Sequence, residues 1–270
     1  MNSDLIIDIY TLCWNEEKII PFVIDYWKYI NPRSIHVYDN ESTDNSIKLL
    51  KEYDKVKIHT YNSNGTIHDG IYLDIKNNCW KGSDADFVIV CDMDECVYSD
   101  HLHDILHYMK ENNQTVSYTA FLTTISTYEQ PYQPDKLYHE YKDTRFILPF
   151  NIKDKALIFS PKKIQEIDYE VGAHTCNPAG RVNYYDKQET DPIQTIHIKD
   201  LSLNYKLTRY HTYLRRLSEY NRKNFLGIHY MYSGQKQVYD YYNGLYSSKK
   251  YNDIINEIRK DENNNSNDVM

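Results

Sequence analysis

Two carboxylates one residue apart, Asp92 and Asp94, directly follow the most apolar segment of the chain, 86–91. Carboxylate oxygens are the hard ligands that Mg²⁺ and Mn²⁺ prefer, and Mg²⁺ is commonly held by one or two carboxylates together with substrate phosphates. A pair at this spacing can share a divalent cation, or one carboxylate can bind the cation while the other binds a ribose hydroxyl. Asp-x-Asp also occurs in solvated acidic turns, so its position directly after a buried strand is what favours the ligand interpretation.

Two further polar clusters, 11–16 and 39–44, each follow a short apolar segment. The acceptors and donors of 39–44 could bind a nucleoside. The same residue types form Asx and Ser turns, and Ser42 or Thr43 could cap a helix. Taken alone, this cluster is best explained by turn chemistry.

Two histidines lie in segments that suit a binding site. His174 belongs to the glycine-bounded segment 172–180, and glycine permits a close approach of the backbone to a ligand. Polar and apolar residues alternate over 195–199, which places His197 and Lys199 on one face of a predicted strand. A single histidine is more often structural, so both remain hypotheses at this point.

Residues 199–223 carry seven Lys and Arg against two acidic residues, in a chain whose net charge is −8. A solvated helix face is the favoured interpretation, since long basic side chains usually face water. The alternatives are a clamp for a diphosphate, a contact for an anionic acceptor, or a contact with a membrane surface.

Strand and helix patterns alternate in the first half of the chain. The expected strands are 5–12, 34–38, 55–61 and 86–91, and the expected helices begin after residue 15 and span 46–53 and about 71–81. Asn15 is expected to cap the first helix, with Pro21 near its start. This alternation predicts parallel βαβ units in a doubly wound α/β sheet. Because ligands of such sheets lie outside the carboxyl ends of the strands, the three polar clusters are expected to form one site.

The second half is less regular. Strands are expected over 115–128 and 145–161, with a loop at 131–135 between them. A helix is predicted from Leu203 to Leu217 by apolar residues at helical spacing. The polar segment that follows residue 260 is expected to fray. The predicted organisation is a catalytic domain over 1–200, a helical extension over 201–260 and a disordered tail over 261–270.

Composition excludes several classes of protein. The 270 residues include 31 Lys and Arg against 39 Asp and Glu, which argues against nucleic-acid binding. Five cysteines, mostly in apolar runs, indicate reduced thiols. No segment approaches the roughly 18 apolar residues of a membrane span, and residues 1–8 lack the basic start of a secretory signal. A cytoplasmic protein is therefore expected, with peripheral membrane contact through the basic helix as an addition.

The order and spacing of several motifs resemble family 2-type GT-A glycosyltransferases. The motifs are 11–17, 36–46, 76–81 and 88–95. The likeness to a bacterial polysaccharide-type subgroup continues through 155–161, 172–178, 197–199, 216–218 and 227–230. Each motif is weak singly, but their ordered combination over roughly residues 6–230 is specific.

The resemblance implies a GT-A fold, a Rossmann-like and mostly parallel sheet flanked by helices, with a C-terminal helical extension. It also implies a nucleotide-diphosphate sugar donor, expected to be a UDP-sugar, and a divalent cation, Mn²⁺ or Mg²⁺. The implied metal site consists of Asp92, Asp94 and His197. In it Asp94 would ligate the metal, Asp92 would touch ribose and metal-bound water, and His197 would be the distal ligand of the metal or of the diphosphate. The implied contacts to base, ribose or donor are Thr11, Asn15, Glu16, Asp39, Asn40, Ser42, Lys76 and Asn77. His174 and Lys199 are further candidates for donor contacts.

The Glu-Asp pair that supplies the base in this family is not recognisable at a comparable position. Asp143, Asp168 and Glu170 are the candidate carboxylates, with Asp143 and Glu170 favoured. An inverting, hexosyltransferase-like enzyme that acts on a saccharide or glycolipid acceptor in surface polysaccharide biosynthesis is expected. The alternative is a catalytically inactive GT-A domain that binds sugar nucleotide or a partner protein. A nucleotidyltransferase is disfavoured, because no glycine-rich phosphate loop follows the first strand.

Overall fold

The computed structural model describes residues 5–125, 147–148, 155–201, 203–227 and 230. The expected loop at 131–135, the carboxylate of Asp143 and the expected tail lie outside these residues. Within the described part, no helix combines the length and apolar character needed to cross a membrane.

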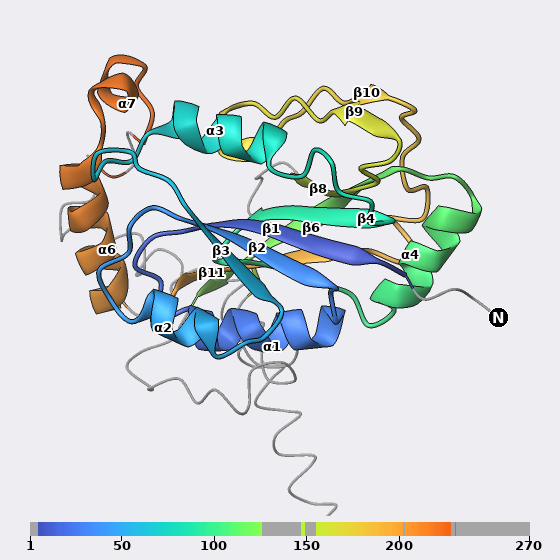
Figure 1. The fold of residues 1–270 in the computed structure, drawn as a ribbon, viewed down its shortest axis with the longest axis horizontal. Coiled ribbons are helices and arrows are strands. Elements are labelled where there is room, and N and C mark those ends of the chain that lie inside the picture. Colours follow the sequence, from blue (N-terminus) through green and yellow to red (C-terminus); the bar gives the residue numbers. More distant parts are fainter. Residues whose placement is uncertain (1–4, 126–146, 149–154, 202, 228–229, 231–270) are drawn as a thin grey trace, which may run out of the picture.

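A mostly parallel sheet forms the centre of the molecule, and its strands follow the order β3-β2-β1-β4-β8-β6-β11-β5 (Figure 1). The strands are β1 (Ile7–Cys13), β2 (Ser34–Asp39), β3 (Val56–Thr60), β4 (Phe87–Asp92), β5 (Glu95–Tyr98), β6 (Val116–Ile125), β8 (Lys155–Phe159) and β11 (Gln194–Asp200). A short β7 (Ile147–Leu148) pairs with β6, and β9 (Ile164–Glu166) pairs with β10 (Ala179–Gly180) in a separate small sheet.

The first four strands in this order are parallel, as the alternation of strands and helices predicts. Their register brings the polar clusters together at one edge. Cys13 at the end of β1 lies opposite Asp39 at the end of β2, and Leu12 lies opposite Asp92 at the end of β4. The predicted convergence of the three clusters is therefore confirmed.

Helices cover both faces of the sheet. They are α1 (Ile20–Ile30), α2 (Ser46–Lys51), α3 (Asp69–Asn78), α4 (Leu102–Glu111), α6 (Leu203–Arg216) and α7 (Glu219–Lys223), with a 3₁₀ turn η2 at Val171–Ala173. One apolar core joins α1 and α4 to one face of the sheet, and a second packs Trp80, Phe159 and Tyr169 against the other face. In Figure 1, α6 and α7 stand beside the edge at which β1, β2 and β4 end.

The start of the first helix differs from expectation. Asn15 is not its cap, because α1 begins at Ile20 and its capping residue Ile19 makes no side-chain bond. Asn15 instead has a positive φ of 53°, a conformation that Asn tolerates better than most residues, and it belongs to a loop before the helix. Pro21 lies in the first turn, as predicted.

Elsewhere the structure differs from expectation at three places: the strand β5 and the ends of the helices α6 and α3. The described part of the segment expected to form strands over 115–128 holds one long strand, β6 (Val116–Ile125), whereas the chain turns after Asp94 into the unpredicted strand β5. The C-terminal helix α6 ends at Arg216, one residue before the predicted Leu217, which pairs with Ile67 instead. The helix predicted over 71–81 begins at Asp69 and ends at Asn78.

Candidate active site

Asp92 lies at the end of β4 among basic side chains. Its Oδ1 is 2.7 Å from Nζ of Lys76 on α3, and its Oδ2 is 3.8 Å from Nζ of Lys155 on β8. Burial raises the pKa of Asp92, but the two lysines outweigh burial and the net shift is downward. The carboxylate is therefore ionised, and its side chain is still 37% exposed at the edge of the sheet.

A second, fully buried ion pair lies beneath it. Lys155 also pairs with Glu95, whose carboxylate accepts the backbone N–H of Asp92 at 3.1 Å. An ionised carboxylate in such a position needs a partner, because burying an unpaired charge is very unfavourable. Lys155 and Glu95 thus fix the backbone that presents Asp92.

Asp94 faces the opposite strand and the C-terminal helix. Its Oδ2 lies 3.3 Å from Nε2 of His197 on β11 and 3.3 Å from Nη2 of Arg209 on α6. The backbone carbonyl of Asp94 accepts the N–H of Ile198 at 2.7 Å, which holds the turn against β11. Asp94 and His197, which are 103 positions apart in the sequence, are thereby brought within 3.3 Å of each other.

Glu16 is held by α6. Arg209 donates to both carboxylate oxygens of Glu16, at 2.6 and 2.7 Å, and both side chains are largely buried. Burial raises the pKa of Glu16 to about 7, while Arg209 acts in the opposite direction. The basic run 199–223 was expected to be a solvated helix face, and this is wrong for Arg209, which is turned into the site.

The predicted nucleoside-binding cluster is tied together by its own hydrogen bonds. Asp39 accepts the N–H and the hydroxyl of Ser42, and Ser42 Oγ accepts the N–H of Asn15 at 2.9 Å. The Asn15 side chain accepts the N–H of Thr43 at 2.7 Å, and Asn40 binds Ser63. These bonds shape the loops after β1 and β2, and Thr11 is buried within β1.

The remaining predicted residues lie apart from this cluster or are only partly described. Asn77 donates to the carbonyl of Tyr169 and accepts its N–H, so both ends of its amide contact the backbone. Glu170 is exposed and accepts the hydroxyl of Thr175, and the backbone of Asp168 has a positive φ of 51°. His174 follows η2 and is partly buried, and Lys199 lies on β11 with its side chain outside the described part.

Whether a divalent cation fits can be judged from the donor atoms. No group of three His, Cys, Asp or Glu side chains that could hold a metal occurs in the described ranges, so Asp92 is not gathered with Asp94 and His197 in one cluster. Asp94 and His197 nevertheless present an oxygen and a nitrogen 3.3 Å apart, close enough for one ion to bind both. This pair suits a cation whose other ligands are waters and substrate phosphates.

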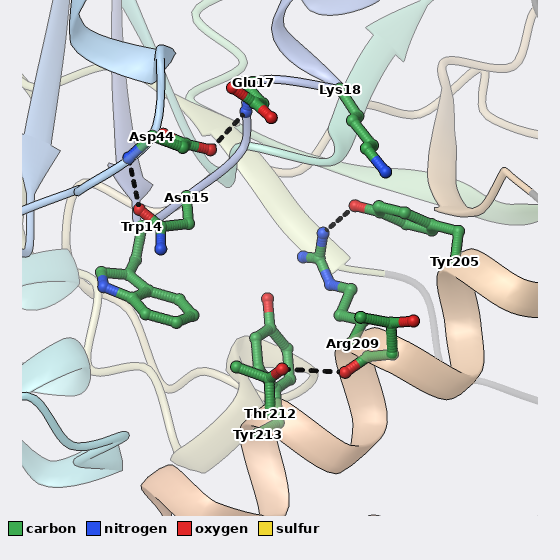
Figure 2. Close-up of a pocket in the computed structure, with 10 residues that line it drawn as sticks. Trp14, Asn15, Glu17, Lys18, Asp44, Tyr205, Arg209, Thr212 and Tyr213 are labelled. Atoms are coloured by element: carbon green, nitrogen blue, oxygen red, sulfur yellow. Dashed lines mark hydrogen bonds between the residues drawn. The ribbon is translucent and has the colours of Figure 1, made fainter.

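A cavity of about 340 Å³ opens beside Arg209, between α6 and the loop after β1 (Figure 2). Figure 2 shows Arg209 and Tyr205 reaching from α6 toward the loop that carries Asn15 and Lys18. The lining residues are Trp14, Asn15, Glu17, Lys18, Asp44, Tyr205, Thr208, Arg209, Thr212 and Tyr213.

Lys155, Glu95 and Arg209 were not predicted from the sequence, nor was Arg216, whose contacts with Trp14 and Gly65 are described below. The basic run contained a signal for the two arginines, since a clamp was one of its alternatives. The seven-residue spacing places both arginines on one helix face and the exposed Arg215 on another, but the sequence does not show which face meets the site.

Comparison with known proteins gives one family. Residues 8–164, more than half of the chain, match the family model described as "Glycosyl transferase family 2". No curated protein matches the chain. The crystal structure of S. aureus TarS 1–349 is similar with a TM-score of 0.42 and 13% identity, over 92% of this chain and 74% of that one. The crystal structure of S. aureus TarS is similar with a TM-score of 0.43 and 13% identity, over 92% of this chain and 45% of that one.

The family match confirms the likeness found in the motifs. The mostly parallel sheet with helices on both faces is the GT-A, Rossmann-like fold that this likeness implies, and the fold prediction is confirmed.

Proposed function

The chain belongs to glycosyl transferase family 2, and from this premise we propose that it moves a sugar from a UDP-sugar to a saccharide or glycolipid acceptor in surface polysaccharide synthesis. The observation that carries the proposal is the meeting of Asp94 and His197, 3.3 Å apart, at the edge where Asp39 and Asp92 also end their strands. Such an edge is where α/β sheets bind their ligands.

Asp94 and His197 would hold a divalent cation, Mn²⁺ or Mg²⁺. When bound, this ion supplies a Lewis acid that neutralises the charge developing on the leaving diphosphate. Asp92, kept ionised by Lys76 and Lys155, is suited to accept a hydroxyl of the donor's ribose. Arg209 lies 3.3 Å from Asp94 and limits how far that carboxylate can move.

The loops after β1 and β2 would receive the base and ribose. Asp39 is buried and fixed by Ser42, and Asn15 and Asn40 bind the neighbouring loops, so the receiving surface is formed in advance. Pre-formed contacts reduce the ordering cost of binding. Thr11, Glu16, Lys76, Asn77, His174 and Lys199 complete the proposed donor site. The side chains of Glu16, Lys76 and Asn77 are held in place by the protein contacts described above.

An inverting reaction needs a carboxylate to take the proton of the acceptor hydroxyl. Glu170 and Asp143 are the proposed bases. Glu170 is exposed and directly precedes η2, which packs against α3, so an acceptor could reach it from solvent.

The domain over 1–200 would carry the chemistry, with 201–260 as a helical extension. The protein is proposed to be cytoplasmic and to contact a lipid-linked acceptor at the membrane surface through exposed cations such as Lys223.

Two measurements on the full chain test this function. A panel of UDP-, GDP- and CMP-sugars with Mn²⁺ should raise the melting temperature most with UDP-sugars, because a ligand that binds only the native state stabilises it. Release of UDP from the stabilising sugar should then be detectable, and Asp94→Asn should abolish it while the exposed Asp104→Asn retains it. Stabilisation without any UDP release, with or without oligosaccharides, would favour an inactive sugar-nucleotide-binding domain. Stronger stabilisation by GDP or CMP donors would contradict the proposed donor.

A further inference from the structure

The end of α6 is attached to the loop that follows β3. The N–H of Ile67 donates to the carbonyl of Arg216 at 2.7 Å, and the N–H of Ser218 donates to the carbonyl of Ile67 at 3.0 Å. Ile67 and Leu217, 150 positions apart in the sequence, are thus joined by a short parallel bridge. This attachment fixes the backbone of Arg216 near the carboxyl edge of the sheet.

The guanidinium of Arg216 is also fixed. Its Cζ lies 3.1 Å from the centre of the Trp14 ring, and its Nε donates to the carbonyl of Gly65 at 2.9 Å. Trp14 is the first residue after β1, so this stacked pair stands next to the strand end that faces Asp39 and Asp92. Two independent contacts therefore determine where the guanidinium nitrogens lie.

One of those nitrogens lacks a partner. Nη2 of Arg216 is buried and makes no hydrogen bond, and no carboxylate of the described residues forms an ion pair with this arginine. Burial lowers the pKa of Arg216, and only tyrosines act against this shift. Arg209, seven residues earlier and hence on the same helix face, is different, because Glu16 satisfies it.

Arg216 as a whole is only partly buried, but its Nη2 is a buried donor without an acceptor, which is unfavourable. A guanidinium stacked flat on an aromatic ring keeps its N–H groups in its own plane, where they can bind a phosphate in a bidentate manner. The unsatisfied Nη2 is therefore an anion-binding group at the edge where the proposed donor binds. If Arg216 only covered the Trp14 ring, this would explain the stacking but not why Nη2 has no hydrogen-bond partner.

We propose that Arg216 binds a phosphate of the donor's diphosphate through Nη2, with Trp14 and the Gly65 carbonyl holding the guanidinium in place. This assignment rests on the proposed function and names a further donor-binding residue for it. It also explains why α6 crosses the edge of the sheet: Arg209 fixes the helix to Glu16, and Arg216 supplies the charge that the diphosphate requires.

The test compares uridine, UMP and UDP by calorimetry with Mn²⁺, using the full chain. Arg216→Gln should weaken UDP binding by about ten- to hundredfold, the effect of losing a hydrogen bond to a charged group, and leave uridine binding unchanged. The matched control is Arg215→Gln, on the same helix but exposed, which should match the wild type for all three ligands. Arg216→Lys keeps the charge and should recover part of the UDP affinity.

Several results would overturn the assignment. Unchanged UDP affinity in Arg216→Gln, an equal loss for uridine and UDP, or tighter uridine binding would each show that Arg216 only covers Trp14 or supports the fold. If Arg216→Gln does not fold, Arg216→Lys provides the test. Lysine lacks the bidentate geometry of arginine, so this variant should weaken the binding of UDP more than the binding of uridine. A wild type that binds none of the three nucleotides would overturn the proposed function itself, whereas wild-type binding that Arg216→Gln retains in full overturns this assignment alone.

Discussion

Arg209 donates from its two terminal nitrogens to the two carboxylate oxygens of Glu16, at 2.6 and 2.7 Å, although the residues are 193 positions apart. The pair joins the C-terminal helix α6 to the loop after the first strand. Their side chains are only 12% and 7% exposed, so neither charge could remain there without the other. The same guanidinium contacts Asp94, which links the position of α6 to the proposed metal ligand.

Breaking this pair should destabilise the fold. Arg209→Met leaves Glu16 buried without its counter-charge, and such losses amount to about 3–5 kcal/mol. The double variant with Glu16→Gln should lose less than Arg209→Met alone, because no buried charge remains. Urea unfolding measures both. Lys223→Met, which removes an exposed pair with Glu219, should cost about 0.5 kcal/mol or less, and a comparable loss in Arg209→Met would refute the buried-pair interpretation.

The stability conferred by Glu16 should depend on pH. Burial raises its pKa to about 7 from an ordinary value of 4.5. An acid whose pKa is raised by folding contributes stability that is complete below its unfolded pKa and is lost as the pH rises through its folded pKa. The free energy of unfolding of the wild type, relative to Glu16→Gln, should therefore fall between pH 4.5 and about 7. A rise over this range would mean that Arg209 keeps the carboxylate ionised throughout.

Asp92 should titrate at higher pH once Lys76 is neutralised. Lys76 lies 2.7 Å from Asp92 and is the largest of the influences that lower the pKa of this carboxyl, while burial opposes it. Carboxyl-carbon NMR titration of Lys76→Met should show the pKa of Asp92 shifted upward. Lys81→Met, which removes an exposed pair with Glu166, serves as the control, and an equal shift in both variants would contradict a specific effect.

Asn77 should matter for stability as well as for any donor contact. Its amide satisfies both the N–H and the carbonyl of Tyr169, a residue whose ring is buried in the second core. Asn77→Ala leaves both backbone groups without this partner, at a cost of about 1–3 kcal/mol. Asn78→Ala, which lies next to it but is exposed and bonds only within α3, should cost less. A wild-type melting temperature in Asn77→Ala would exclude the structural role.

The carboxyl edge of the sheet was predictable because parallel strands end together. Once 5–12, 34–38 and 86–91 were identified as parallel strands, Asp39 and Asp92 were expected at the same edge of the sheet, where the structure places them on either side of β1. Apolar spacing also located α6, since its pattern depends only on the residues within the helix.

The partners of α6 were not predictable in this way. Spacing shows which face of a helix is apolar but not which distant carboxylate faces a given cation. Arg209, Arg215 and Arg216 have the same residue type and local context, yet one binds Glu16, one is exposed and one stacks on Trp14. Asn15 was misplaced for a related reason, because capping and left-handed loop positions both favour Asn.

The assignment of Asp94 and His197 as the metal site is tested most directly by calorimetric titration of UDP into the wild type and Asp94→Asn, each with Mn²⁺ and with a chelator. The wild type should bind UDP more tightly with Mn²⁺, and Asp94→Asn should lose this gain while keeping its chelator-state affinity and its fold. His197→Ala should also lose the gain in UDP affinity from Mn²⁺, and Asp104→Asn should show the same gain as the wild type. A gain from Mn²⁺ that is unchanged in Asp94→Asn would contradict the assignment of Asp94 and His197 as the metal site of a glycosyltransferase.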